Sequence, residues 1–124
     1  MDPLTFYCHP RCTTCAKARK WLTEHQIPFQ EIDLTQTAPK AATLEDLWHK
    51  SGLPLKKFLN TSGREYRAKG KEYFASLTPL ELLDALASSG MLIKRPVLTD
   101  GEKVAVGFKE EVYQTMFAPL TQVQ

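Results

Sequence analysis

The spacing of apolar residues in the first third of the chain predicts a strand, a helix and a second strand. Residues 4–8 are a short apolar run that His9-Pro10 ends, which is typical of a strand. Over residues 13–26 the apolar positions fall on one face of a helix; they are Cys15, Ala18, Trp21 and Leu22. This helix should end before Pro28, because a residue that precedes proline avoids helical dihedral angles. A second strand is expected over residues 29–34.

Helical signals dominate the middle of the chain. We expect Thr43 to cap a helix that continues to Lys50. Residues 78–81 have the sequence Thr-Pro-Leu-Glu, which places a capping threonine before a proline at the first helical position and a glutamate at the third. A second helix should therefore start here, and Gly90 should end it. Residues 60–77 show no pattern that predicts either a helix or a strand.

Two apolar runs near the end of the chain predict a β-hairpin and a final helix. The runs cover residues 96–99 and 103–106, and the intervening Asp100-Gly101 favours a tight turn. An amphipathic helix should follow over about residues 109–117.

This order of elements is that of the thioredoxin fold. The sequence therefore predicts a single α/β domain over residues 1–124, with a thioredoxin-like, mixed four-stranded sheet flanked by helices. A helical insertion is expected at about residues 43–90, between the second and third strands. In this fold a cis proline opens the third strand and faces the cysteine pair, so the Arg95–Pro96 bond should be cis.

Composition narrows the range of functions. The chain has 124 residues and a net charge of +2, which is too small to indicate direct binding to nucleic acid. No apolar run is long enough to span a membrane, and the first residues do not resemble a signal peptide. We therefore expect a cytoplasmic protein, without membrane attachment, and a monomer.

The cysteines carry the candidate chemistry. Cys8, Cys12 and Cys15 lie within eight residues, which is not the pattern of a secreted disulfide framework. Cys12 falls at the start of the first helix, after Arg11, and Cys15 follows one turn later on the apolar face. A free cysteine is only about 3% thiolate at pH 7, and a helix N-terminus raises that fraction by favouring the anion. The spacing therefore favours a redox pair.

Three other interpretations of these thiols stay open. A zinc site needs two more ligands, and His9, His25 and His49 lack a matching spacing, so we expect no metal and regard the histidines as incidental. The spacing C-x3-C-x2-C also occurs in iron–sulfur enzymes that are built on much larger barrels. The thiols could instead be inert parts of the core, which is the expected place of Cys8.

The sequence resembles the arsenate reductase (ArsC)/Spx family in four blocks that occur in the same order. The blocks are residues 5–7 leading to Cys12-Thr13-Thr14-Cys15, residues 52–63, residues 90–96, and residues 106–108. The resemblance covers most of the chain, and it implies the same fold and helical insertion.

The resemblance also implies an enzymatic role and its residues. Glutaredoxin-coupled arsenate reductases use one nucleophilic cysteine, which matches Cys12, and three arginines, of which Arg95 matches one. The other two arginine positions correspond to about Asn60 and Gly107 here. The expected catalytic set combines Cys12 and Arg95, which this resemblance supports, with Cys15, which the spacing of the cysteines supplies. The expected substrate-binding residues are Arg11, Thr13, Thr14, Asn60 and Pro96.

Two functions follow from this resemblance. In the first, Cys12 reduces a disulfide or a small oxyanion such as arsenate and Cys15 resolves the adduct. Glutathione, glutaredoxin or thioredoxin would then be the reductant, with no bound cofactor. In the second, the pair is an Spx-like disulfide switch that controls binding to the C-terminal domain of the RNA polymerase α subunit, for which Gly52 matches a contact glycine.

Overall fold

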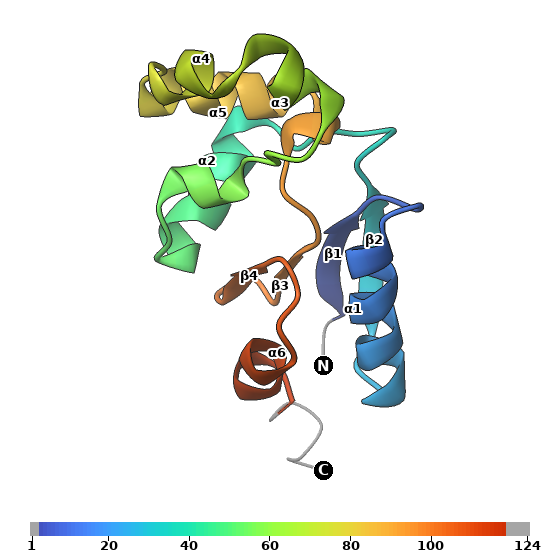
Figure 1. Ribbon diagram of the computed structural model, residues 1–124. Coiled ribbons are helices and arrows are strands. Elements are labelled where there is room, and N and C mark those ends of the chain that lie inside the picture. Colours follow the sequence, from blue (N-terminus) through green and yellow to red (C-terminus); the bar gives the residue numbers. More distant parts are fainter. Residues whose placement is uncertain (1–2, 119–124) are drawn as a thin grey trace. The chain divides into compact units, whose positions relative to one another are not determined.

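The computed structural model describes residues 3–118 of the chain. This part of the protein divides into two compact units, whose helices and strands are labelled in Figure 1. The first unit contains the residues up to Asp33 and those from Arg95 onward, and the second unit is Leu34–Lys94. The second unit contains the helical insertion that was predicted between the second and third strands.

A mixed four-stranded sheet forms the centre of the first unit. Its strands are β1 (Leu4–Cys8), β2 (Phe29–Asp33), β3 (Val97–Thr99) and β4 (Val104–Val106), arranged in the order β2-β1-β3-β4. β1 pairs with β2 in parallel, and the β1–β3 and β3–β4 pairs are antiparallel. A parallel β-α-β unit joined to an antiparallel hairpin is the thioredoxin-like arrangement, so the predicted fold class is confirmed.

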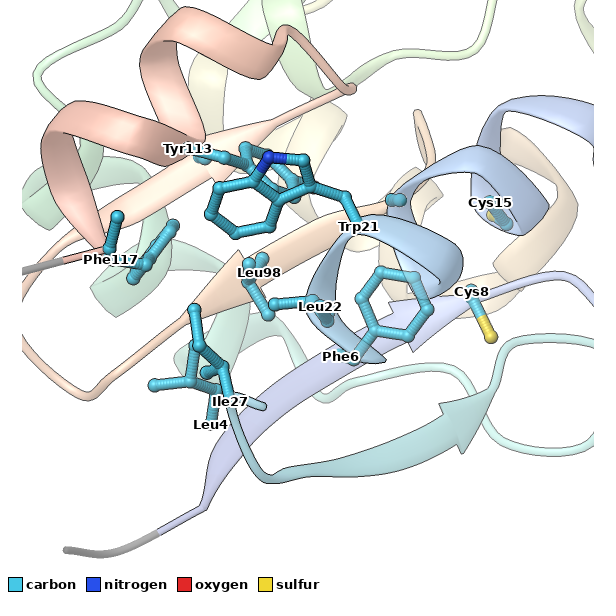
Figure 2. Packing of buried hydrophobic residues seen from close by; sticks show 13 residues of the cluster. Leu4, Phe6, Cys8, Cys15, Trp21, Leu22, Ile27, Leu98, Tyr113 and Phe117 are labelled. Carbon is cyan, nitrogen blue, oxygen red and sulfur yellow. The ribbon is translucent and has the colours of Figure 1, made fainter. Parts of the chain in front are cut away.

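Two helices, α1 (Thr13–Glu24) and α6 (Glu110–Met116), share one hydrophobic core with this sheet. Alternation along β1 directs Leu4, Phe6 and Cys8 to the same face, where they are buried. The rings of Trp21 and Tyr113 meet edge to face at 5.5 Å and join the two helices (Figure 2). The rest of this core includes Ala18, Leu22, Ile27, Leu98, Ala105 and Phe117. The predicted apolar face of the first helix is therefore confirmed.

The first helix ends at Glu24, two residues earlier than predicted. Gln26 adopts a left-handed conformation with φ 56°. Its N–H donates to the Thr23 carbonyl, and the N–H of Ile27 donates to the Leu22 carbonyl at 3.0 Å. These two bonds make a Schellman motif, in which glutamine takes the position that glycine usually holds.

The second unit consists of short helices. They are α2 (Ala41–Ser51), η1 (Leu55–Phe58), α3 (Arg64–Lys69), α4 (Lys71–Ala75), α5 (Pro79–Ser88) and η2 (Gly90–Leu92). The capping box at the start of α5 is confirmed, because Thr78 and Glu81 each accept a hydrogen bond from the other's backbone N–H. Residues 60–77, which no pattern assigned, contain α3 and α4.

One predicted helix boundary in this unit is wrong, and another is right for a different reason. Thr43 does not cap α2, which starts at Ala41 after Lys40, because two alanines are good helix formers and extend the helix backward. α5 ends at Ser88, just before Gly90 as predicted, but Gly90 does not have the left-handed conformation of a helix stop. It is needed because a Cβ at this position would overlap the carbonyl oxygen of Leu34, the residue that follows β2.

No helix within residues 3–118 is long and apolar enough to cross a membrane.

Candidate active site

A four-residue turn connects β1 to α1 and carries Cys12. The N–H of Cys12 donates to the His9 carbonyl at 3.1 Å, which closes a β-turn with Pro10 at its second position. Cys12 is the N-cap of α1, with extended dihedral angles (φ −82°, ψ 124°), and its carbonyl accepts the N–H of Ala16 at 3.0 Å. The predicted place of Cys12 at the start of the helix is therefore confirmed.

The surroundings of Cys12 favour its thiolate. The side chain is half-buried, and this burial acts to raise its pKa. Four other contributions outweigh burial and lower the pKa below that of an ordinary thiol: the N–H and the thiol of Cys15, the N–H of Thr14 and the charge of Arg95. α1 has no acidic side chain in its first turn, so no carboxylate competes for these amides. The neutral thiol makes no conventional capping hydrogen bond, since a thiol is a weak acceptor compared with a thiolate.

Cys15 differs from Cys12 in its burial and in the direction of its pKa shift. It is fully buried one turn into α1, and burial raises the pKa of its thiol to about 12. The N–H of His9 donates to its Sγ at 3.4 Å and partly opposes this shift. The hydrogen bond and charge that it shares with Cys12 raise the pKa of Cys15 further. The two thiols, both free, therefore form an asymmetric pair in which Cys12 is the acid and Cys15 the proton-bearing partner.

Arg95 places an unpaired cationic group beside this pair. The side chain is half-buried, and its Nη1 is buried without a hydrogen-bond acceptor among residues 3–118. The Arg95–Pro96 bond is cis, as predicted. Pro96 is buried, and its carbonyl accepts the N–H of Gly107 at 2.7 Å. A buried guanidinium N–H without an acceptor is suited to bind an anion at this position.

The remaining predicted substrate contacts divide between the two units. Arg11 and Thr13 are exposed and Thr14 is half-buried at the start of α1, next to Cys12. Asn60 belongs to the second unit, where its Nδ2 donates to the Met91 carbonyl at 3.2 Å and its Oδ1 accepts the N–H of Ser62. Its amide therefore supports the local fold of that unit, and its contact with a substrate stays a prediction.

Gly107, the other position that corresponds to an arginine, has left-handed dihedral angles. Its φ is +84°, and open space surrounds the position of a Cβ. An arginine would fit there sterically but would adopt a strained backbone conformation, so this backbone favours glycine.

Cys8 is part of the core, as expected, but it has polar partners that the sequence did not reveal. The thiol is fully buried, and burial raises its pKa to about 12. Arg19 donates to its Sγ at 3.4 Å, and the same guanidinium binds both carboxylate oxygens of Glu31, at 2.9 and 3.2 Å. Within residues 3–118, no group of three or more His, Cys, Asp or Glu side chains is arranged to hold a metal ion.

His9 is the residue of this site that sequence reasoning missed. It was regarded as incidental, yet its ring accepts the N–H of Arg11 at 3.0 Å, and its main chain bonds to Cys12 and to Cys15. A signal was present in the sequence: a side-chain acceptor before proline is typical of the first position of a turn, and there it binds the N–H two residues later.

The chain belongs to the ArsC family, whose model matches residues 7–116. The uncharacterized protein YusI of Bacillus subtilis is 52% identical over 93% of this chain and 98% of its own length. The regulatory protein MgsR of the same organism is 30% identical, over 85% of this chain and 82% of its own.

Solved structures agree with the fold. A protein related to the ArsC family from Bacteroides fragilis has a TM-score of 0.84 at 36% identity, over 92% of this chain and 97% of its own. The structure of a possible arsenate reductase from Streptococcus mutans has a TM-score of 0.79 at 42% identity, over 86% and 91% of the two chains.

A pair of alkylating reagents tests whether Arg95 attracts anions to Cys12. Iodoacetate is anionic and iodoacetamide is neutral, so the ratio of their rates cancels any change in the thiolate fraction. We expect Arg95→Met to lower this ratio by roughly threefold or more, because it removes a half-buried cation whose Nη1 has no acceptor among residues 3–118. Arg11→Met, which removes an exposed cation, should change the ratio less. An unchanged ratio in Arg95→Met, or an equal loss in both variants, would contradict this role.

Proposed function

We propose that this protein is a thiol–disulfide oxidoreductase of the ArsC family, with Cys12 as the nucleophile and Cys15 as the resolving thiol. The observation that carries the proposal is the placement of the two thiols: Cys12 is half-buried at the N-cap of α1 and Cys15 is fully buried one turn later, which shifts their pKa values in opposite directions. The lowered pKa gives Cys12 the thiolate that attack on a disulfide requires. The raised pKa keeps Cys15 as a thiol until Cys12 has reacted.

The proposed reaction has two steps. The Cys12 thiolate attacks one sulfur of a substrate disulfide, forms a mixed disulfide and releases the other sulfur as a thiolate, which takes up a proton. Cys12 then no longer carries the negative charge that raised the pKa of Cys15. Cys15 loses its proton and attacks Cys12 Sγ, which forms the Cys12–Cys15 disulfide and releases the second substrate thiolate. The substrate gains two electrons, and an external dithiol, or two molecules of a monothiol, returns two electrons to the protein.

Arg95 and the first turn of α1 suit an anionic substrate. The unpaired Nη1 of Arg95 and the leading amides of the helix would stabilise negative charge near Cys12, and the exposed Arg11 and Thr13 lie in the adjacent turn. A small oxyanion such as arsenate fits this chemistry. Oxidation of two thiols to a disulfide supplies the two electrons that convert arsenate to arsenite with loss of water. The similarity to a possible arsenate reductase from Streptococcus mutans supports this reading.

We propose glutathione, glutaredoxin or thioredoxin as the reductant, without a bound cofactor. Both reacting sulfurs belong to the chain itself, so the chemistry needs only an external thiol to complete the cycle. The half-buried Cys12 is the sulfur that such a partner would reach, because Cys15 is fully buried.

A redox-switched regulator is the second candidate function, and two observations favour it. The relative MgsR is a regulatory protein. Gly52 is exposed at the C-terminal end of α2 with φ +70°, and open space surrounds it, so a partner could approach its backbone closely. We expect that, in this case, the C-terminal domain of the RNA polymerase α subunit is captured by the oxidised protein more strongly than by the reduced one. Equal capture in both states, or none, would contradict this second function.

Trapping with glutathione disulfide tests the assignment of the two cysteines. We expect Cys15→Ser to accumulate a stable mixed disulfide at Cys12, because the resolving thiol is missing, while the wild type proceeds to the internal disulfide. Cys12→Ser should form neither species at a comparable rate. Intact-mass measurement after quenching with acid separates the products. A wild-type rate in Cys12→Ser, or resolution in Cys15→Ser, would refute the assignment.

A further inference from the structure

His9 is the donor or the acceptor in the hydrogen bond of every backbone N–H in the connection between β1 and α1. The connection has three such groups, because Pro10 has none. The N–H of Cys12 donates to the His9 carbonyl at 3.1 Å, and the N–H of Arg11 donates to the imidazole Nδ1 at 3.0 Å. The third N–H is that of His9 itself, which donates to Cys15 Sγ at 3.4 Å. One residue therefore accounts for all the backbone donors of the segment that presents the nucleophile.

The imidazole performs the task that asparagine or aspartate performs in many turns. A side-chain acceptor at the first position of a β-turn binds the N–H of the third residue and reinforces the turn. The backbone N–H of Arg11 can only donate, so Nδ1 must be the acceptor. This hydrogen bond therefore requires the tautomer whose proton lies on Nε2. Pro10 fixes φ at the second position and adds to the rigidity of the same turn.

We infer that His9 is a positioning residue for the cysteine pair. Its imidazole Nδ1 holds the turn that presents Cys12 as the N-cap of α1, and its main-chain N–H holds Cys15 Sγ in place. This inference rests on the proposed redox function and extends it to a residue that does not touch the reacting atoms with its side chain. The effect of His9 should therefore be seen in the reactivity of Cys12, beyond any effect on folding.

Substitutions that keep or remove the acceptor separate this role from a general structural one. His9→Asn retains an acceptor that can reach the N–H of Arg11, whereas His9→Ala and His9→Phe do not. The measurement is the rate of iodoacetamide modification of Cys12 from acid to alkaline pH, with Cys12→Ser as the blank. We expect the Ala and Phe variants to react several-fold more slowly at pH 7, with the midpoint of the profile moved to higher pH. The Asn variant should stay within about twofold of the wild type, since it restores the turn hydrogen bond.

His25→Ala is the matched control, because it removes another half-buried imidazole from the same unit. That ring stacks on Trp21 at 4.0 Å, at the opposite end of α1 from Cys12. Its loss should leave the alkylation profile unchanged. If His9→Ala does not fold, as judged by circular dichroism, the comparison of the Phe and Asn variants carries the test.

Two results would overturn the inference. Wild-type profiles in His9→Ala and His9→Phe would show that the acceptor is not needed, and equal slowing in Asn, Ala and Phe would show that the hydrogen bond is not the cause. Failure of the proposed function looks different. In that case the pKa of Cys12 in the wild type would equal or exceed that of an ordinary thiol, whatever the His9 variants do.

Discussion

The unpaired N–H groups at the start of α1 determine what the rest of this site can do. A helix leaves its first amides without intrahelical partners, and they carry a partial positive charge. Here Cys12 caps the helix, and the amides of Thr14 and Cys15 lie where they favour its thiolate over its thiol. Burial acts in the opposite direction and is the largest single contribution, so the anion depends on all of these neighbours acting together. Arg95, which lies two residues before β3, adds charge from outside the helix.

The hydrophobic core that packs against α1 also gives the three thiols different properties, because it buries two of them and leaves the third partly exposed. Cys15 and Cys8 share the cluster that contains Phe6, Leu22 and Tyr113, and burial keeps both of them protonated. Of the three thiols, only Cys12 is partly exposed at the edge of the cluster. In the proposed reaction a single sulfur is therefore reactive at first, and a second, one turn away, becomes reactive when the first loses its charge. Cys8 is held apart from this chemistry by Arg19 and Glu31, which bind each other as well as the thiol.

The elements with a clear period were predictable from the sequence, and those stabilised by local geometry were not. The β1–α1–β2 unit, the hairpin and the start of α5 follow from hydrophobic alternation and capping residues. α3 and α4 are too short to show an amphipathic period, and Phe74 is their single fully buried side chain. Gly90 was correctly recognised as important but for the wrong reason, because its close approach to Leu34 arises from tertiary packing. At the site, Cys12, Cys15 and Arg95 were identified from spacing and resemblance, whereas the turn role of His9 depends on a hydrogen bond of its ring.

The most direct test of this account is the titration of Cys12 in the reduced wild-type protein. Thiolate absorbance in the ultraviolet, measured from acid to alkaline pH, reports ionisation, and the difference from Cys12→Ser isolates this residue. The account predicts a midpoint clearly below the value of about 8.5 that a free cysteine shows. A midpoint at or above that value would mean that the helix amides and Arg95 do not overcome burial, and the redox assignment would be wrong.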